Sequence, residues 1–295
     1  MKKFLAIILA AVMTLGVCGV CFALNENEAR VVLGADLNDT QRAEALTWFG
    51  VTDGNVPVLT VTNRDERMYF EGKLPDKKLG HVALSSIYMV GAAEGSGLKI
   101  ETFNINYCTA EMYENALISA GITDANIKIW APRPISGTAA LTGVYKAYED
   151  MTGRVLNNAA KDLGIEELIT TGQLAEYIGS EDALAIIGDL KKILDETKDM
   201  DDEHVMEKIH SIAADYGATL TDEQANQIFS LARMFEGLSA EEIQARLVNM
   251  AKAAQKAQTF GDTVQSVINT IGDFIKTIGD FFVNIFNKWF GGNKI

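Results

Sequence analysis

The sequence predicts a mixed fold, α+β or α/β, in which an N-terminal domain with a mixed sheet precedes an all-helical region and a C-terminal amphipathic helix. Three observations predict it. Short β-branched runs alternate with helical patterns between residues 24 and 152. After Gly153 the strand signals disappear, and helical patterns separated by glycines continue to residue 258. In residues 259–295, apolar residues recur every three or four positions, as on one face of a helix.

The N-terminal domain begins with two expected strands, 31–33 and 56–61, both rich in valine. Asn38 is expected to cap the helix between them, which runs to Phe49. Gln41 stands three residues after Asn38, where its side chain can complete a capping box.

The rest of this domain is expected to contain a β-hairpin, a helix, a strand and a closing helix. Segments 82–90 and 98–105 flank a glycine-rich stretch, whose glycines permit the positive φ of a tight reversal, and this predicts the hairpin. Thr109 is expected to cap the next helix, and residues 127–130 read as the last strand. Ser136 is then expected to open the closing helix.

Two further helix starts are visible in the helical region. Thr221 is followed three residues later by Gln224, and Ser239 by Glu242, each ahead of apolar residues. This spacing is typical of capping boxes. It favours shared capping chemistry over an internal duplication, because a repeat architecture should recur several times.

Residues 1–23 have the composition of a cleavable signal peptide. Lys2 and Lys3 precede an apolar run, and Ala23 supplies a small residue at the expected cleavage site. We therefore expect a mature chain that begins at Leu24 and is secreted or extracytoplasmic, with association to the cell envelope as one form of this. The alternative is an uncleaved membrane anchor.

Composition narrows the class of partner. The 295 residues carry a net charge of −14, and removal of the signal leaves 24 basic and 40 acidic residues, a net charge of −16. This balance argues against nucleic acid as a partner. Cys108 is the one cysteine outside the signal, so no disulfide within the mature chain is expected, and no cofactor is expected either.

Several segments together resemble a known family. They are VVLGADL at 31–37, GSGLKIET at 95–102, MYENALISAGI at 112–122 and APRPISGTAALTGVYKAYE at 131–149. The sequence resembles the YpuA-like family of secreted proteins of Gram-positive bacteria, built on domain of unknown function 1002. The resemblance implies export and this order of domains. It implies no catalytic residue, because none is established for the family.

The clearest candidate binding site lies where the last strand leads into the closing helix. Ser136, Gly137 and Thr138 open that helix, and Arg133 stands just before it. Free backbone N–H groups and the positive end of the helix dipole can hold an anion. The alternative is an ordinary helix cap followed by small residues that pack closely on the sheet.

A charge cluster after the second strand gives a further candidate, Arg64, in a short helix that Asn63 is expected to cap. The alternative is a set of solvated surface charges. Cys108 with His81 is the weakest candidate, because a lone cysteine at a strand end is more often a packing residue. No catalytic residue is predicted.

No metal site is predicted either. Glu207 and His210 form an ExxH pair with His204 nearby. A dimetal site would need a second such pair on a facing helix, and none is found. The glycine-rich GSG at 95–97 lacks the spacing of a phosphate loop and is explained by turn chemistry.

The C-terminal segment is expected to contact a membrane surface or a partner through the apolar face of its helix. Three occupants of that face are possible: the outer leaflet of a membrane, a second copy of the chain, or a groove of the helical region. The contact residues expected are Ile271, Ile275, Ile278, Phe282 and Trp289.

We expect a non-enzymatic exported protein that acts as a binding or structural module for an unknown envelope ligand. The absence of a converging nucleophile, base or metal set motivates this. The alternative is an extracytoplasmic hydrolase of wall or extracellular polymers that uses carboxylates such as Glu101 or Glu111. Two or more titratable groups in a deep cleft of the first domain would favour the hydrolase.

Overall fold

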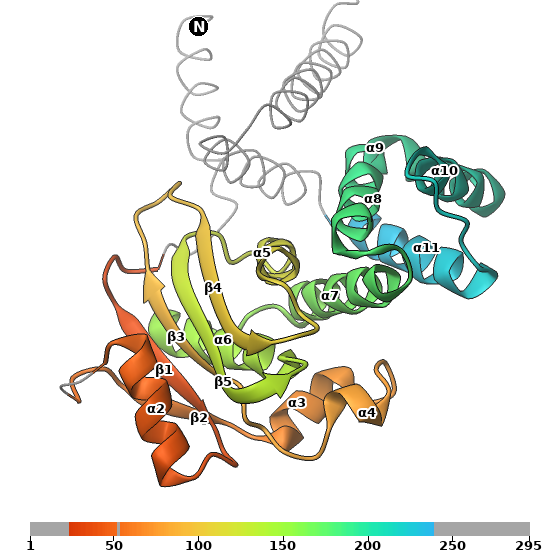
Figure 1. Cartoon of the computed structure of the whole chain (residues 1–295). Coiled ribbons are helices and arrows are strands. Elements are labelled where there is room, and N and C mark those ends of the chain that lie inside the picture. Colours follow the sequence, from red (N-terminus) through yellow and green to blue (C-terminus); the bar gives the residue numbers. More distant parts are fainter. Residues whose placement is uncertain (1–23, 52–53, 239–295) are drawn as a thin grey trace, which may run out of the picture.

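A computed structural model describes residues 24–51 and 54–238 of the chain (Figure 1). The expected signal peptide, the Ser239–Glu242 capping box and the C-terminal amphipathic helix lie outside the described residues. The mixed fold is confirmed, because a five-stranded sheet in the N-terminal half is followed by helices. No helix in the described ranges has both the length and the apolar character needed to cross a bilayer.

The sheet has the strand order β2-β1-β3-β5-β4. Strands β1 and β2 run parallel, as do β4 and β5, while β3 is antiparallel to both of its neighbours. The strands are β1 (Ala29–Gly34), β2 (Val58–Val61), β3 (Ser86–Gly91), β4 (Leu98–Ile105) and β5 (Ala125–Ile135).

The expected β-hairpin is wrong. Strands β3 and β4 exist, but β5 lies between them and pairs with both. Ile127 and Ile129 of β5 are fully buried, which suits a central strand, whereas β4 alternates exposed and partly buried positions after Leu98 and suits an edge. The chain returns from β4 to β5 through α5 (Ala110–Ser119), as a parallel pair requires a crossover connection.

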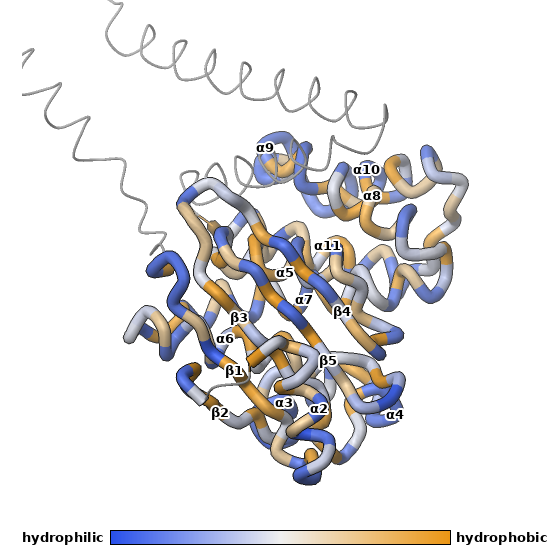
Figure 2. The backbone as a smooth tube through the Cα atoms, turned by 60° about the vertical axis from the view of Figure 1, so that its left-hand side comes forward, coloured by the Kyte–Doolittle hydropathy of each residue, from blue (hydrophilic) through white to orange (hydrophobic). Residues whose placement is uncertain are grey.

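Hydrophobic residues recur along the strands of the sheet (Figure 2), and their side chains belong to two different cores. Val32 of β1 and Ile129 of β5 point to the larger core, which α5 and α6 (Thr138–Thr152) cover. Val31 and Trp130, their sequence neighbours, point to a smaller core under α2 (Asp39–Phe49) on the opposite face. Figure 1 shows α2 and α6 on these two sides.

The capping predictions have mixed outcomes. Asn38 with Gln41, Thr109, and Thr221 with Gln224 cap their helices as expected. Two predictions are wrong. Thr62 and not Asn63 caps α3 (Asn63–Phe70), because Asp65 completes a capping box with Thr62. Gly137 and not Ser136 is the cap of α6, with no side-chain hydrogen bond of its own.

The helical region packs around α7, which also belongs to the first core. Ile165, Leu168 and Ile169 of α7 lie in the core of the sheet domain, whereas Leu163 and Leu174 face the second core. A domain boundary near Thr152 stays a prediction. All of α7 follows Thr152 in the chain, yet its side chains pack in both cores. The remaining helices are α4 (Asp76–Leu79), α7 (Asn158–Ile178), α8 (Ser180–Lys192), α9 (Leu194–Thr197), α10 (Asp202–Asp215) and α11 (Asp222–Glu236).

Candidate functional site

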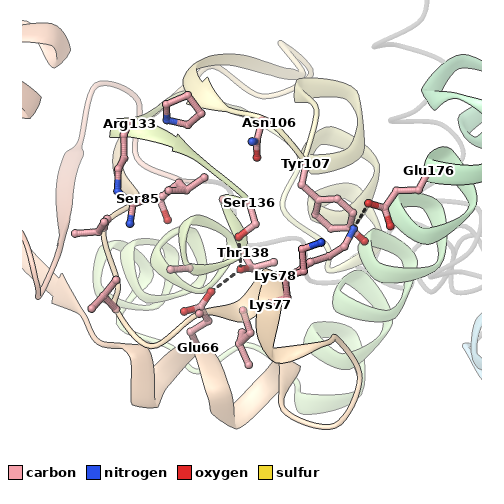
Figure 3. A pocket seen from close by; sticks show the side chains of 18 residues that line it. Glu66, Lys77, Lys78, Ser85, Asn106, Tyr107, Arg133, Ser136, Thr138 and Glu176 are labelled. Carbon is pink, nitrogen blue, oxygen red and sulfur yellow. Dashed lines mark hydrogen bonds and ion pairs between the residues drawn. The ribbon is translucent and has the colours of Figure 1, made fainter.

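A pocket of about 440 Å³ opens where β5 passes into α6 (Figure 3). Its walls also include α3, α4, the segment before β3, the connection from β4 to α5, and α7. Its polar and charged side chains are Glu66, Lys77, Lys78, Ser85, Asn106, Tyr107, Arg133, Ser136, Thr138 and Glu176.

Gly137 makes the sharp turn at the base of this pocket. Its φ is +94°, a backbone conformation that side chains with a Cβ rarely adopt. A Cβ at this position would lie 2.3 Å from the hydroxyl oxygen of Tyr113, which donates a hydrogen bond to the Gly137 carbonyl at 2.6 Å. The turn therefore needs a glycine, and α6 can start directly beneath the pocket.

The carboxyl group of Glu66 occupies the N-terminus of α6. The Thr138 hydroxyl donates to Glu66 Oε1 at 2.5 Å, and the backbone N–H of Ala139 also donates to this carboxyl group. Asn63 Nδ2 donates to Oε2 at 3.0 Å. A side chain from α3 thus supplies the cap that Gly137 lacks.

Burial dominates the chemistry of Glu66, whose residue is 2% exposed. Loss of hydration raises its pKa to about 7, although the hydrogen bonds from Thr138 and Asn63 and the charge of Arg67 act in the opposite direction. Glu66 is therefore poised between its neutral and charged forms near neutral pH. A line of hydroxyl groups leads to it, because Ser136 Oγ lies 3.2 Å from Thr138 Oγ1.

Two buried hydroxyl groups in the pocket wall have no hydrogen-bond partner among the described residues. They are Ser85 Oγ, whose residue is 1% exposed, and Tyr107 Oη. Figure 3 places Ser85 and Tyr107 on different sides of the pocket, with Ser136 and Thr138 between them. Tyr107 packs closely on α7, since a Cβ on Gly172 would lie 2.5 Å from its hydroxyl oxygen.

The charges of the wall are unevenly paired. Lys78 forms an ion pair with Glu176, and its Nζ lies 3.8 Å from the centre of the Tyr107 ring. Lys77 and Arg133 are exposed and form no side-chain hydrogen bond or ion pair with the described residues. Three cations thus face two carboxyl groups, one of which is Glu66.

A family model for proteins of unknown function, DUF1002, matches residues 33–266. The chain belongs to this family. It is also similar to the uncharacterized protein YpuA of Bacillus subtilis (strain 168), with 39% identity over 234 residues, which cover 78% of this chain and 80% of the Bacillus protein. The resemblance expected from the sequence is confirmed. No solved structure matches the chain.

The structure of this DUF1002 protein brings four of the five candidate ligand-binding residues together. Arg133, Ser136, Gly137 and Thr138 all line the pocket. Arg64 is exposed on α3 and is not among the lining residues. That any of them binds a ligand stays a prediction.

Sequence reasoning missed the role of Glu66, Ser85 and Tyr107. A partial signal existed for Glu66, because Glu66 and Phe70 are four residues apart, which places both on the buried face of α3. For Ser85 and Tyr107 no local pattern marks the site, since they belong to separate connections that meet only in the folded chain.

The remaining sequence candidates lie outside the pocket lining. Burial raises the pKa of Cys108 to about 12, so its thiol is protonated, and His81 contacts Arg67, with its Nδ1 3.3 Å from Arg67 Nη2. Glu101 and Glu111 are exposed. His204 Nδ1 lies 2.7 Å from Oδ1 of Asp201, the residue that caps α10. Within the described ranges, no group of three or more His, Cys, Asp or Glu residues is placed to hold a metal ion.

Proposed function

We propose that this protein is an exported, non-enzymatic binding module of the cell envelope that takes a small ligand in the pocket between β5, α6 and α4. Export is supported by the composition of residues 1–23. Attachment to the envelope would be the task of the C-terminal segment, whose apolar periodicity suits a membrane surface or a partner. Liposome flotation of the full chain against one ending at Gln258 tests that attachment.

One observation carries the binding role: the pocket wall contains buried hydroxyl groups that have no hydrogen-bond partner in the described part of the chain. A buried polar group without a hydrogen bond costs about 1–3 kcal/mol, so such groups are rare unless something completes them. Ser85 and Tyr107 both line one cavity. A volume of about 440 Å³ lies within the range of small-molecule sites, which combine an apolar wall with a few placed polar groups.

Ligand retention tests the proposal. The full chain, purified after secretion, is incubated with the small-molecule fraction of an envelope extract, passed through a desalting column and analysed by native mass spectrometry. We expect a retained compound that the double variant Ser85→Ala/Arg133→Ala loses at least tenfold. Thr142→Val is the matched control, because Thr142 is equally buried and unpartnered but does not line the pocket.

The proposal fails if the wild-type chain retains no compound, or if the double variant retains the same compound as well as the control does. Circular dichroism of each variant before the measurement shows that it is folded.

A hydrolase is the second candidate, and Glu66 favours it. A buried carboxyl group with a pKa of about 7 has the character of a general acid, and the pocket does bring titratable groups together. The second carboxylate, Glu176, is paired with Lys78 and stands at the opposite wall in Figure 3. Turnover of a retained polymer fragment that stops in Glu66→Gln, while binding persists, would establish the hydrolase.

A further inference from the structure

We infer that the pocket binds a small anion and that Glu66 takes up a proton when the anion binds. The inference rests on the proposed binding function, because it names the ligand class of the same pocket. It also goes beyond that function, since it couples binding to pH.

The donors in the pocket point to an anion. Arg133 has only donors on its guanidinium group, and neither it nor Lys77 is neutralised by a described residue. Ser85 adds a hydroxyl group that is fully buried and has no hydrogen-bond partner within residues 24–51 and 54–238. The whole chain has 26 basic and 40 acidic residues, yet this wall has three bases and two acids, so the pocket attracts charge of the sign that the rest of the surface repels.

Glu66 already holds the position that an external anion would prefer. Its carboxyl group accepts from Thr138 and from the N–H of Ala139 at the start of α6. A bound anion would therefore lie in the same small cavity as this carboxylate. Two negative groups that share one site force the weaker acid to become protonated.

The groups around Glu66 decide which proton moves. Tyr113 and Cys108 keep their protons, because burial raises the pKa of both. Glu176 forms an ion pair with Lys78. Asp65 is the neighbour of Glu66 on α3. It forms an ion pair with Lys146 of α6 and accepts capping hydrogen bonds from Thr62, and these interactions lower its pKa. The other cations of the pocket wall are Lys77 and Arg133. The charge of Arg67, which does not line the pocket, also acts on Glu66.

Glu66 is therefore the acid of this cavity that exchanges its proton near neutral pH. Burial raises its pKa to about 7, so the protonated form is available at small cost at pH 6 and scarce at pH 8. When only the protonated form admits the anion, the apparent dissociation constant scales with the inverse of the protonated fraction. Between pH 6 and pH 8 this predicts a loss of affinity of roughly tenfold.

Titration calorimetry with defined probes tests the inference. The full chain is titrated at pH 6 and pH 8 with D-glucuronate, which is a carboxylate, and with sulfate, which is an inorganic oxyanion. Both keep their charge over this range. D-Glucose is titrated as the neutral counterpart of glucuronate. We expect at least one anion to bind tenfold or more tightly than D-glucose at pH 6, and its affinity to fall about tenfold at pH 8. The anion that binds distinguishes a carboxylate ligand from an oxyanion ligand.

Two variants separate the proton from other causes. Glu66→Gln should bind the anion with nearly equal affinity at both pH values, because it mimics the protonated acid. Glu176→Gln is the control, since it removes the other carboxylate of the wall and should keep the pH dependence. Independently of any variant, titration of the wild type at pH 8 in buffers with different ionisation enthalpies should show uptake of about 0.9 proton per bound anion, because Glu66 is then mostly ionised in the free protein.

The inference is overturned if neither anion binds more tightly than D-glucose, if wild-type binding takes up no proton, or if Glu66→Gln keeps the pH dependence. A neutral compound retained from the envelope extract would overturn it while leaving the proposed binding function intact. Retention of nothing at all would remove the proposed function itself.

Discussion

At the scale of the residue, Gly137 determines whether the pocket can form. Its positive φ and the 2.3 Å approach that a Cβ would make to the Tyr113 hydroxyl leave no room for another residue. Tyr113 is itself fully buried and cannot move aside. The sequence indicated a candidate site at Gly137, but the reason for the glycine lies in a helix that is remote in the chain.

Gly137→Ala should destabilise the protein by about 3 kcal/mol. This is the sum of the cost of a left-handed backbone conformation at alanine and the cost of a steric clash in a packed core. Gly121→Ala is the matched control. Gly121 has a similar φ of +89° but open space where its Cβ would be, so only the backbone cost of about 1 kcal/mol should appear. Urea unfolding measures both, and equal losses for the two variants would contradict the clash.

Glu66 makes stability depend on pH in a direction unusual for a carboxyl group. Its folded pKa of about 7 lies above the ordinary value of 4.5, so folding favours the protonated form. The stabilisation is complete below pH 4.5 and is lost as the pH rises to 7, by about 3 kcal/mol for a difference of this size. Glu66→Gln should lack this loss. Urea unfolding at pH 5 and pH 8 checks it, and parallel pH dependence of wild type and variant would be the contrary result.

Among the secondary-structure elements, local signals correctly predicted three helix caps, whereas strand order was not predictable. The caps at Asn38, Thr109 and Thr221 depend on residues three positions apart, which the sequence displays directly. The hairpin prediction failed because pairing of β3 with β5 depends on a long-range choice of neighbour. The same holds for the pocket, since Ser85 precedes β3 and Tyr107 follows β4, and the order of the strands decides that both line one cavity.

A buried polar cluster joins α5, α7 and α8. Glu167 of α7 accepts from Ser119 of α5 and pairs with Lys191 of α8, and all three residues are at most 3% exposed. Glu167→Ala would leave the buried ammonium group without its carboxylate and should cost about 3–5 kcal/mol. The double variant Glu167→Leu/Lys191→Met should recover most of that loss. Thermal unfolding measures both, and a double variant no more stable than the single one would contradict this account.

At the scale of the whole molecule, α7 ties the sheet domain to the helical region. The sequence shows the change from strand to helix patterns after Thr152. It does not show that Ile165 and Leu168 pack in the first core, because an apolar helix face does not reveal which core it joins. The two parts are therefore coupled through α7, and Lys191 of α8 adds a direct contact to Ser119 of α5.

A fragment of residues 24–178 should consequently unfold at a higher temperature, and more cooperatively, than a fragment of residues 24–152. The longer fragment keeps the three α7 residues of the first core, whereas the shorter one exposes the surface of α5 that they cover. Scanning calorimetry of both fragments is the measurement. If the shorter fragment is as stable as the longer one, the boundary near Thr152 is a true domain boundary and α7 is dispensable to the sheet domain.

We propose that the cavity between β5, α6 and α4 is a ligand site. A crystal structure of the full chain purified after secretion in the presence of the compound it retains tests this most directly. We predict electron density for that compound within hydrogen-bond distance of Ser85 Oγ and beside Arg133, with the turn at Gly137 unchanged. Density for the compound elsewhere on the protein, with Ser85 bonded to a protein group and Arg133 paired with a carboxylate of the chain, would contradict the claim.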